Sequence, residues 1–262
     1  MNSPIPDLPA VSTAGDLLRG VSIPLRAFTL ILRTPKLLML SLACAAVTGL
    51  TLIGVAWGAS GLAQRAADAL ISADSGWQHA ASIGLSIVFF IMLFVVGALT
   101  VPNLLLAPLQ DPLSEATEER CGDFTSPAFS LSATTKGIIE SLSHTLMRLS
   151  LMLLGLAVLF PLHFIPVAGS VSWVALSSIW SMFWIAAEHL SNPMARHLRP
   201  FKQVIAALRG RLPLALGFGA ALYVLLWVPV LNFFLMPVAV VAGTLLFRGM
   251  LKSGALPEAA RQ

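Results

Sequence analysis

The chain has 262 residues, of which 57% are hydrophobic and only 11% are charged. Soluble domains carry about 25% charged residues, so this composition predicts an integral membrane protein and excludes a soluble enzyme. The apolar runs lack the period-two alternation of a membrane β-barrel, which leaves helices as the spanning elements. The net charge is +4. With no basic and aromatic module to bind nucleic acid, these cations are expected to face anionic lipid headgroups.

The N-terminal part predicts a tail, a surface helix and then the first span. Residues 1–16 are expected to be a flexible tail, because they lack the basic segment and apolar core of a signal peptide. Residues 17–32 mix apolar residues with arginines, which predicts an amphipathic helix on the membrane surface. Thr34 suits the N-cap and Pro35 the first residue of a helix. The charge-free run Leu37 to Trp57 is the first predicted transmembrane helix.

A polar connection, Gly58 to His79, separates this span from the second one, Ala80 to Leu109. Pro108 is expected to end the second span, since proline removes a backbone donor. The acidic segment Asp111 to Asp123 follows. It predicts a water-exposed helix rather than a metal site, because its carboxylates lack the spacing of a calcium loop.

Two further apolar runs, Leu149–Ala187 and Leu212–Phe247, are each interrupted by prolines. Each break has an aromatic residue, a β-branched residue, Pro, Val, an apolar residue and then a residue that tolerates positive φ. We expect two similar helical hairpins that cross the membrane either fully or only partly. The predicted turn residues are Pro166 and Gly169 in the first hairpin, and Pro229 and Asn232 in the second.

Basic residues predict the topology. Of the 16 Lys and Arg residues, only Arg65 lies in the connection between the first two spans, and residues 188–211 form the most basic connection. The positive-inside rule places both termini and the basic connections, with their amphipathic helices, in the cytoplasm. The proline turns then point outward. We expect one membrane domain over 17–251, followed by a short tail over 252–262.

The sequence contains no recognisable catalytic, cofactor-binding or metal-binding motif. The group Glu188, His189 and His197 does not have the spacing of a metalloprotease helix, which favours a polar cluster at headgroup depth. His163 is the one ionisable residue expected inside a span. It either titrates in a water-filled path or bonds a carbonyl freed by the nearby proline. We therefore expect no enzymatic activity, no metal and no cofactor.

Helix N-termini offer a place for an anion. They present free N–H groups and the positive end of the helix dipole, and Arg33 and Lys36 stand beside the start of the first long helix. One hypothesis is an anion path that uses these groups. The alternative is that both cations only anchor the helix at the membrane surface. A third possibility is a non-transporting membrane protein that organises lipids or partner proteins.

Four sequence stretches carry a resemblance to a known family. They are Ala107–Pro108 with the acidic helix through Gly122, FIPVAG (164–169), WSMFWIAAEHLSNP (180–193) and LGFGAALYVLLWVPVLNFFLMPVAVVAGTLLF (216–247). With these stretches the chain, from about Leu18 to Leu251, resembles the CysZ-type sulfate permeases, a family that includes the etoposide-induced membrane proteins.

The resemblance implies an all-helical oligomer with two long transmembrane helices and two hairpins that enter the membrane incompletely. It also implies sulfate uptake at a bacterial inner membrane, supplying sulfur assimilation and cysteine synthesis. Bacterial members carry Gly-Leu-Arg-Arg after the proline that opens the first long helix, whereas here Pro35 is followed by Lys36-Leu37-Leu38-Met39. Only Leu37 matches this motif, and apolar residues replace both of its arginines. The expected anion site is therefore Arg33, Lys36 and Leu37, where the two cations would replace the arginines only in part. The expected partners are an inorganic anion such as sulfate, membrane lipids and further copies of the chain.

Overall fold

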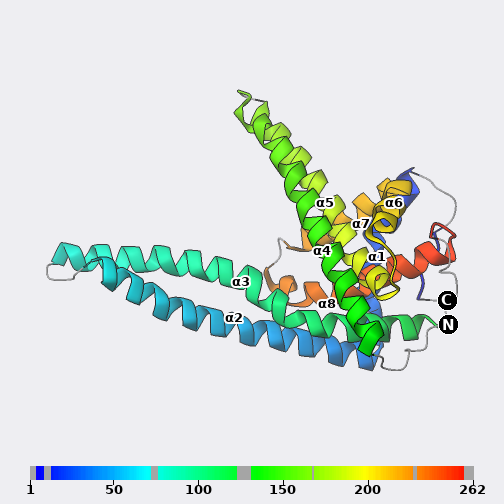
Figure 1. Ribbon diagram of the computed structural model, residues 1–262, viewed down its shortest axis with the longest axis horizontal. Helices are drawn as coiled ribbons and strands as arrows, with labels where there is room; N and C mark the ends of the chain where they lie inside the picture. The colour runs from blue at the N-terminus through cyan, green and yellow to red at the C-terminus, as the bar shows by residue number, and fades with distance from the viewer. Residues whose placement is uncertain are drawn as a thin grey trace. The chain divides into compact units, whose positions relative to one another are not determined.

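The computed structural model describes residues 4–8, 13–71, 76–122, 131–166, 168–226 and 229–256. Within these ranges every regular element is a helix (Figure 1), which confirms the predicted all-α membrane fold. The elements are α1 (Thr13–Arg33), α2 (Pro35–Leu70), α3 (Gly76–Cys121), α4 (Leu131–Leu159), the 3₁₀ helix η1 (Phe160–Phe164), α5 (Gly169–Arg196), α6 (Phe201–Gly210), α7 (Leu212–Leu226) and α8 (Pro229–Lys252).

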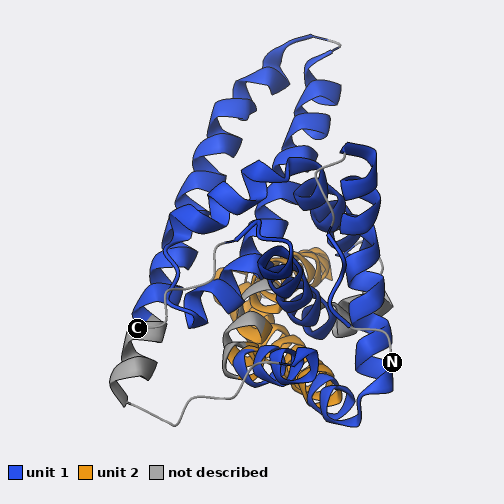
Figure 2. Cartoon of the chain, turned by 90° about the vertical axis from the view of Figure 1, so that its right-hand side faces the viewer, with its two compact units in different colours: residues 1–41, 111–262 blue, residues 42–110 orange. Residues whose placement is uncertain are grey.

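The chain divides into two compact units (Figure 2). Unit 1 comprises Met1–Ser41 and Asp111–Gln262, and unit 2 comprises Leu42–Gln110. Unit 2 therefore consists of most of α2 and the first part of α3, and unit 1 holds the remaining helices. The single domain expected over 17–251 thus contains two compact parts.

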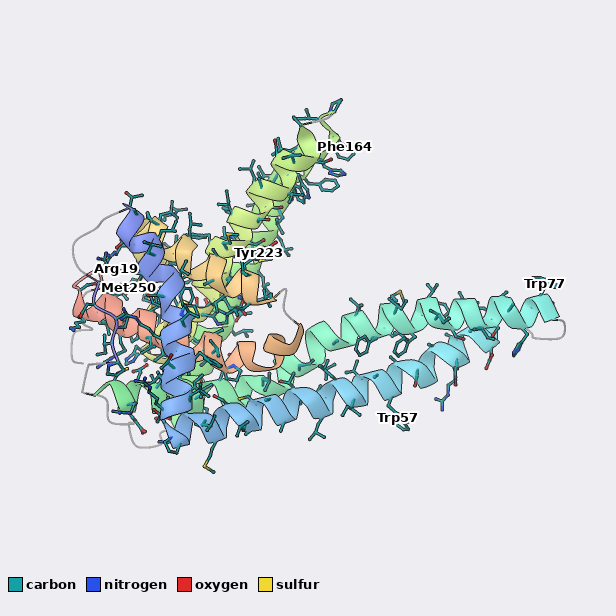
Figure 3. The ribbon with its side chains drawn as sticks, turned by 180° about the vertical axis from the view of Figure 1, so that it is seen from behind. Arg19, Trp57, Trp77, Phe164, Tyr223 and Met250 are labelled. Atoms are coloured by element: carbon teal, nitrogen blue, oxygen red, sulfur yellow. The ribbon has the colours of Figure 1, made fainter. Side chains whose placement is uncertain are left out.

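Within unit 2, α2 is longer than predicted. It continues from the expected end at Trp57 to Leu70, through the segment predicted to be a polar connection. The prediction was wrong because the polar residues there are set among alanines, which favour a helix. With 36 residues, α2 is about 54 Å long, well beyond a bilayer core. Trp57 and Trp77 are 82% and 73% exposed and lie on the outer surface of this unit (Figure 3).

The helix α3 passes through three prolines instead of ending at Pro108, and it continues to Cys121. Membrane helices tolerate interior proline, because neighbouring groups can satisfy the carbonyl that proline frees. Contacts inside unit 2 join α3 to α2. The Ser82 hydroxyl donates a hydrogen bond of 3.4 Å to Asp68 Oδ1, and a Cβ at Gly97 would collide with the Val55 side chain.

In unit 1, α4, η1 and α5 form the first predicted hairpin. Pro166 lies between η1 and α5, and Gly169 is the first residue of α5. Gly169 does not use the positive φ that glycine tolerates; a side chain there would collide with the Leu162 carbonyl oxygen. The Trp180 indole donates a 3.0 Å hydrogen bond to the Met152 carbonyl and so joins the two arms.

The second hairpin breaks earlier than expected. The helix α7 ends at Leu226 and α8 begins at Pro229, so Asn232 lies inside α8 and not at a turn. Proline suits the first turn of a helix, where its missing N–H would have no helical partner. At 15 residues α7 is about 22 Å long, too short for a full crossing. The 24 residues of α8 extend for about 36 Å.

The core of unit 1 depends on glycine contacts between helix backbones. A Cβ at Gly20 of α1 would collide with the Leu214 carbonyl of α7, and one at Gly217 of α7 would collide with the Leu17 carbonyl of α1. The predicted surface helix α1 is therefore packed against α7. Small residues allow this approach, which strengthens dispersion contacts where water supplies no hydrophobic driving force.

A buried ion pair joins the same two regions. Asp16, which is fully buried, accepts a 2.9 Å hydrogen bond from Arg211 Nε and a second bond from the same guanidinium. Arg211 links α6 to α7. Helix α1 begins at Thr13, inside the expected N-terminal tail, and Leu8 is buried in the core. Leu8 and residues 13–16 thus belong to the packed structure of unit 1.

Four helices of the described residues are long and apolar enough to cross a membrane, or five if α6 and α7, bent by 102°, count as one span. The four are Pro35–Leu70, Gly76–Ala98, Ile139–Phe164 and Gly169–Arg196. Both arms of the first hairpin are included, whereas α7 alone is not long enough. Length therefore permits full crossing for the first hairpin.

The glycine contacts predict that a methyl group has opposite effects on stability at Gly217 and at Gly54. Gly217→Ala should destabilise the protein by about 1–3 kcal/mol, because the added methyl group overpacks the α1–α7 contact. Gly54→Ala, where nothing lies within 4 Å, should be neutral or stabilise α2 by up to about 1 kcal/mol. Thermal unfolding of both variants in one detergent checks this. Equal melting temperatures would contradict the contact.

Candidate functional site

The expected anion site lies where α1 ends and α2 begins. Arg33 is the last residue of α1, and its side chain is exposed. Lys36, in the first turn of α2, is also exposed, and its Nζ lies 2.6 Å from Glu119 Oε2 near the end of α3. Leu37 is 0% exposed and belongs to the hydrophobic core. Two of the three expected residues are therefore exposed, and Lys36 is already bound to a carboxylate.

Next to Glu119 in the sequence begins a largely buried group of polar side chains, which we call the Glu118 cluster. It consists of Ser114, Glu118, Arg196, His197 and Thr244. Glu118 Oε1 accepts a 2.7 Å hydrogen bond from Arg196, and Oε2 lies 2.9 Å from His197 Nε2. Arg196 also donates to the Ser114 hydroxyl at 2.6 Å, and that hydroxyl lies 2.7 Å from Thr244 Oγ1. The cluster joins the C-terminal ends of α3 and α5 to α8.

The acidic segment that forms part of this cluster was predicted to be a water-exposed helix, and this holds for one face only, where Asp111, Glu119 and Arg120 are exposed. Leu113, Ser114, Thr117 and Glu118 are all buried. Spacings of three and four residues place them on one face of α3, and this face turns toward the core. The signal was present in the sequence, because Ser114 and Glu118 are four residues apart and Arg196 and His197 are adjacent elsewhere. Only the fold shows that these pairs meet.

The electrostatics of the cluster favour a structural role. Both oxygens of the Glu118 carboxylate are occupied by Arg196 and His197, which compensates for the loss of hydration. Arg196 and His197 also lie at the C-terminal end of α5, where the helix dipole favours cations. Among the described residues no group of three His, Cys, Asp or Glu residues could hold a metal ion.

The expected turn residues of the two hairpins are far from Arg33 and Lys36 in the sequence. Pro166 is at the tip between η1 and α5, next to Phe164, which is 72% exposed (Figure 3). The ring of His163 lies edge-on to that of Phe164, with 6.1 Å between centroids. The side chains of Pro229 and Asn232 lie outside the described part of the structure. The tip is thus an apolar and aromatic end, as expected for a turn without Lys or Arg.

Two adjacent glutamates allow a matched test of the cluster. Glu118→Ala should destabilise the protein by about 3–5 kcal/mol, because it leaves Arg196 without its buried carboxylate. Glu119→Ala should cost less than about 1 kcal/mol, since its pair with Lys36 is exposed. Melting temperatures in detergent measure both effects. A similar loss in the two variants would show that the cluster contributes no more than a surface ion pair.

Comparison with known proteins connects this architecture to a family. The family model described as "Sulfate transporter CysZ/Etoposide-induced protein 2.4" matches residues 23–237. Curated relatives named "Sulfate transporter CysZ" include those of Salmonella paratyphi A, Salmonella enteritidis PT4 and Salmonella typhi, each 29% identical over 160 residues. These matches cover 61% of this chain and 63% of each relative. The chain therefore aligns with less than two thirds of the relatives' length.

Proposed function

Because the chain belongs to the Sulfate transporter CysZ/Etoposide-induced protein 2.4 family, we propose that it transports an inorganic oxyanion, with sulfate as the first candidate. The family match, together with relatives named sulfate transporters, is the observation that carries this proposal. The multi-pass helical architecture agrees with it. Uptake of sulfate would supply sulfur assimilation and cysteine synthesis.

We propose that the anion first binds at the junction of α1 and α2, at Arg33, Lys36 and the N-terminal backbone beside Leu37. Exposed cations and the positive end of a helix dipole suit a dianion. Lys36 would have to exchange Glu119 for the anion. Their exposed pair, with Nζ and Oε2 2.6 Å apart, is the kind of contact that contributes no more than about 1 kcal/mol, so the exchange costs little.

Sulfate flux tests the proposal. We expect radiolabelled sulfate to enter proteoliposomes containing the protein faster than empty liposomes, and Arg33→Ala/Lys36→Ala to reduce this flux. Glu119→Gln should raise the apparent sulfate affinity up to about fivefold, because it frees Lys36 from a contact of about 1 kcal/mol. Arg65→Ala, which removes an exposed cation of unit 2, serves as the control and should leave the flux unchanged.

The absence of flux with correctly folded protein would refute sulfate transport and favour a non-transporting role in organising lipids or partner proteins. Unchanged flux in the double variant would remove Arg33 and Lys36 from the binding site.

We further propose a homo-oligomer in the bacterial inner membrane, with both termini in the cytoplasm. The distribution of Lys and Arg supports this orientation.

Cysteine labelling tests the orientation. Ala168 is exposed at the tip of the first hairpin, so Ala168→Cys should react with an impermeant maleimide in intact spheroplasts. Ser253→Cys, in the exposed C-terminal part, should react only after permeabilisation. Native cysteines give little background, because Cys44 is buried and burial raises the pKa of the Cys121 thiol to about 11. The reverse labelling pattern would overturn the orientation.

A further inference from the structure

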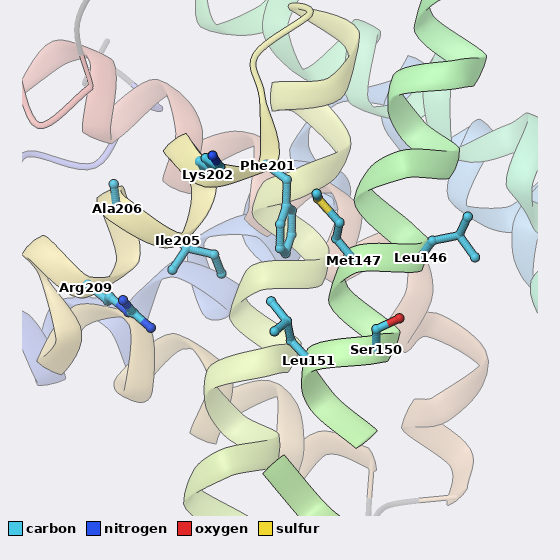
Figure 4. A pocket seen from close by; sticks show the side chains of 9 residues that line it. All are labelled: Leu146, Met147, Ser150, Leu151, Phe201, Lys202, Ile205, Ala206 and Arg209. Atoms are coloured by element: carbon cyan, nitrogen blue, oxygen red, sulfur yellow. The ribbon is translucent and has the colours of Figure 1, made fainter. Parts of the chain in front are cut away.

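A groove of about 650 Å³ lies between α4 and α6 of unit 1. Figure 4 shows Met147 and Leu151 of α4 and Phe201 and Ile205 of α6 around one space. Lys202 and Arg209 line the same groove from α6. The groove thus combines apolar walls with two cations on one side, a combination that neither the packed core nor the Glu118 cluster explains.

The sequence of α6 produces this arrangement. Phe201, Val204, Ala207 and Leu208 are buried and fix one face of the helix to the core. Lys202, Ile205, Ala206 and Arg209 follow the spacing i, i+3, i+4 and i+7, so they share the opposite face. Ile205 is therefore held between two exposed cations. Since α6 rises about 1.5 Å per residue, the backbones of Lys202 and Arg209 are about 10 Å apart.

The directions of α6 and α7 indicate the depth at which the groove lies in a bilayer. Helix α6 is bent by 102° from α7, so it would run along the membrane surface if α7 enters the bilayer. The α4 wall belongs to the candidate span Ile139–Phe164, and Leu146, Met147 and Leu151 are exposed. An amphipathic helix beside an apolar spanning helix places cations at headgroup depth and apolar side chains among the lipid chains.

We propose that this groove binds an anionic phospholipid. The phosphate accepts hydrogen bonds from Lys202 and Arg209, and an acyl chain lies along α4 over Met147 and Leu151. A free oxyanion would fill only a small part of 650 Å³ and would gain nothing from apolar walls. A second copy of the chain would have to desolvate both cations at an apolar surface. This inference does not depend on which solute the protein transports.

Native mass spectrometry of the delipidated full-length protein tests the proposal, with phosphatidylglycerol and phosphatidylcholine of identical acyl chains as probes. Phosphatidylglycerol should bind about 25-fold more tightly, since each basic residue near an anionic headgroup contributes about fivefold. Lys202→Gln/Arg209→Gln should abolish this preference. The matched variant Arg26→Gln/Arg120→Gln, which removes two exposed cations outside the groove, should retain it.

Leu151→Trp, which fills the groove from an exposed position, should weaken binding of both lipids. Equal affinity for the two lipids in the unmodified protein would overturn the proposal, as would a preference that survives Lys202→Gln/Arg209→Gln. Displacement of phosphatidylglycerol by millimolar inorganic phosphate or sulfate would assign the cations to a free oxyanion. A dimer that is lost in Leu151→Trp would assign the groove to a second copy of the chain.

Discussion

The packing of unit 1 depends on the close approach of helix backbones at glycine. Among the described residues such contacts are made by Gly20, Gly217, Gly219 and Gly243, where an added Cβ would collide with a backbone atom of another α-helix. Gly217 and Gly219 lie on the same short helix, α7, and face α1 and α5 respectively. Such contacts are important in lipid, because apolar side chains gain little by leaving a solvent as apolar as themselves. Helix α7 alone is too short to span a membrane, but it packs against α1, α5, α6 and α8.

Polar interactions complete this packing at the helix ends. Asp16 and Glu118 are buried carboxylates, and each is held by at least two nitrogen atoms: Asp16 by Nε and an Nη of Arg211, and Glu118 by Arg196 and His197. Neither pair lies in the middle of an apolar run, where a charge would be most costly. Lys36 with Glu119 is different, because it is exposed and easily exchanged. The buried carboxylates Asp16 and Glu118 thus stabilise the fold, whereas the exposed Lys36 remains available to a solute.

Much of the helical architecture was predictable from the sequence, because long apolar runs leave few alternatives in a bilayer. The start of α2 at Pro35 and the break of the first hairpin near Pro166 follow from proline chemistry alone. Helix ends were predicted less well. Segment 58–70 and the end of α3 carry polar residues but remain helical, because polarity marks exposure to water or a partner rather than loss of helix.

The candidate site could be predicted only in part for a related reason. A local pattern indicates that Arg33 and Lys36 flank a helix N-terminus. That local pattern does not show that Lys36 pairs with Glu119, which is 83 positions away in the sequence. It also does not show that the Leu37 side chain is buried in the core. The Glu118 cluster likewise needs residues from three helices, and no local spacing shows which partner each charge will find.

The pair between Asp16 and Arg211 also has a consequence for biosynthesis. Its partners are 195 positions apart, so Asp16 leaves the ribosome long before Arg211 exists. During that interval α1 lacks both its ionic partner and the glycine face of α7. Docking of α1 closes unit 1 only after the C-terminal helices have been synthesised.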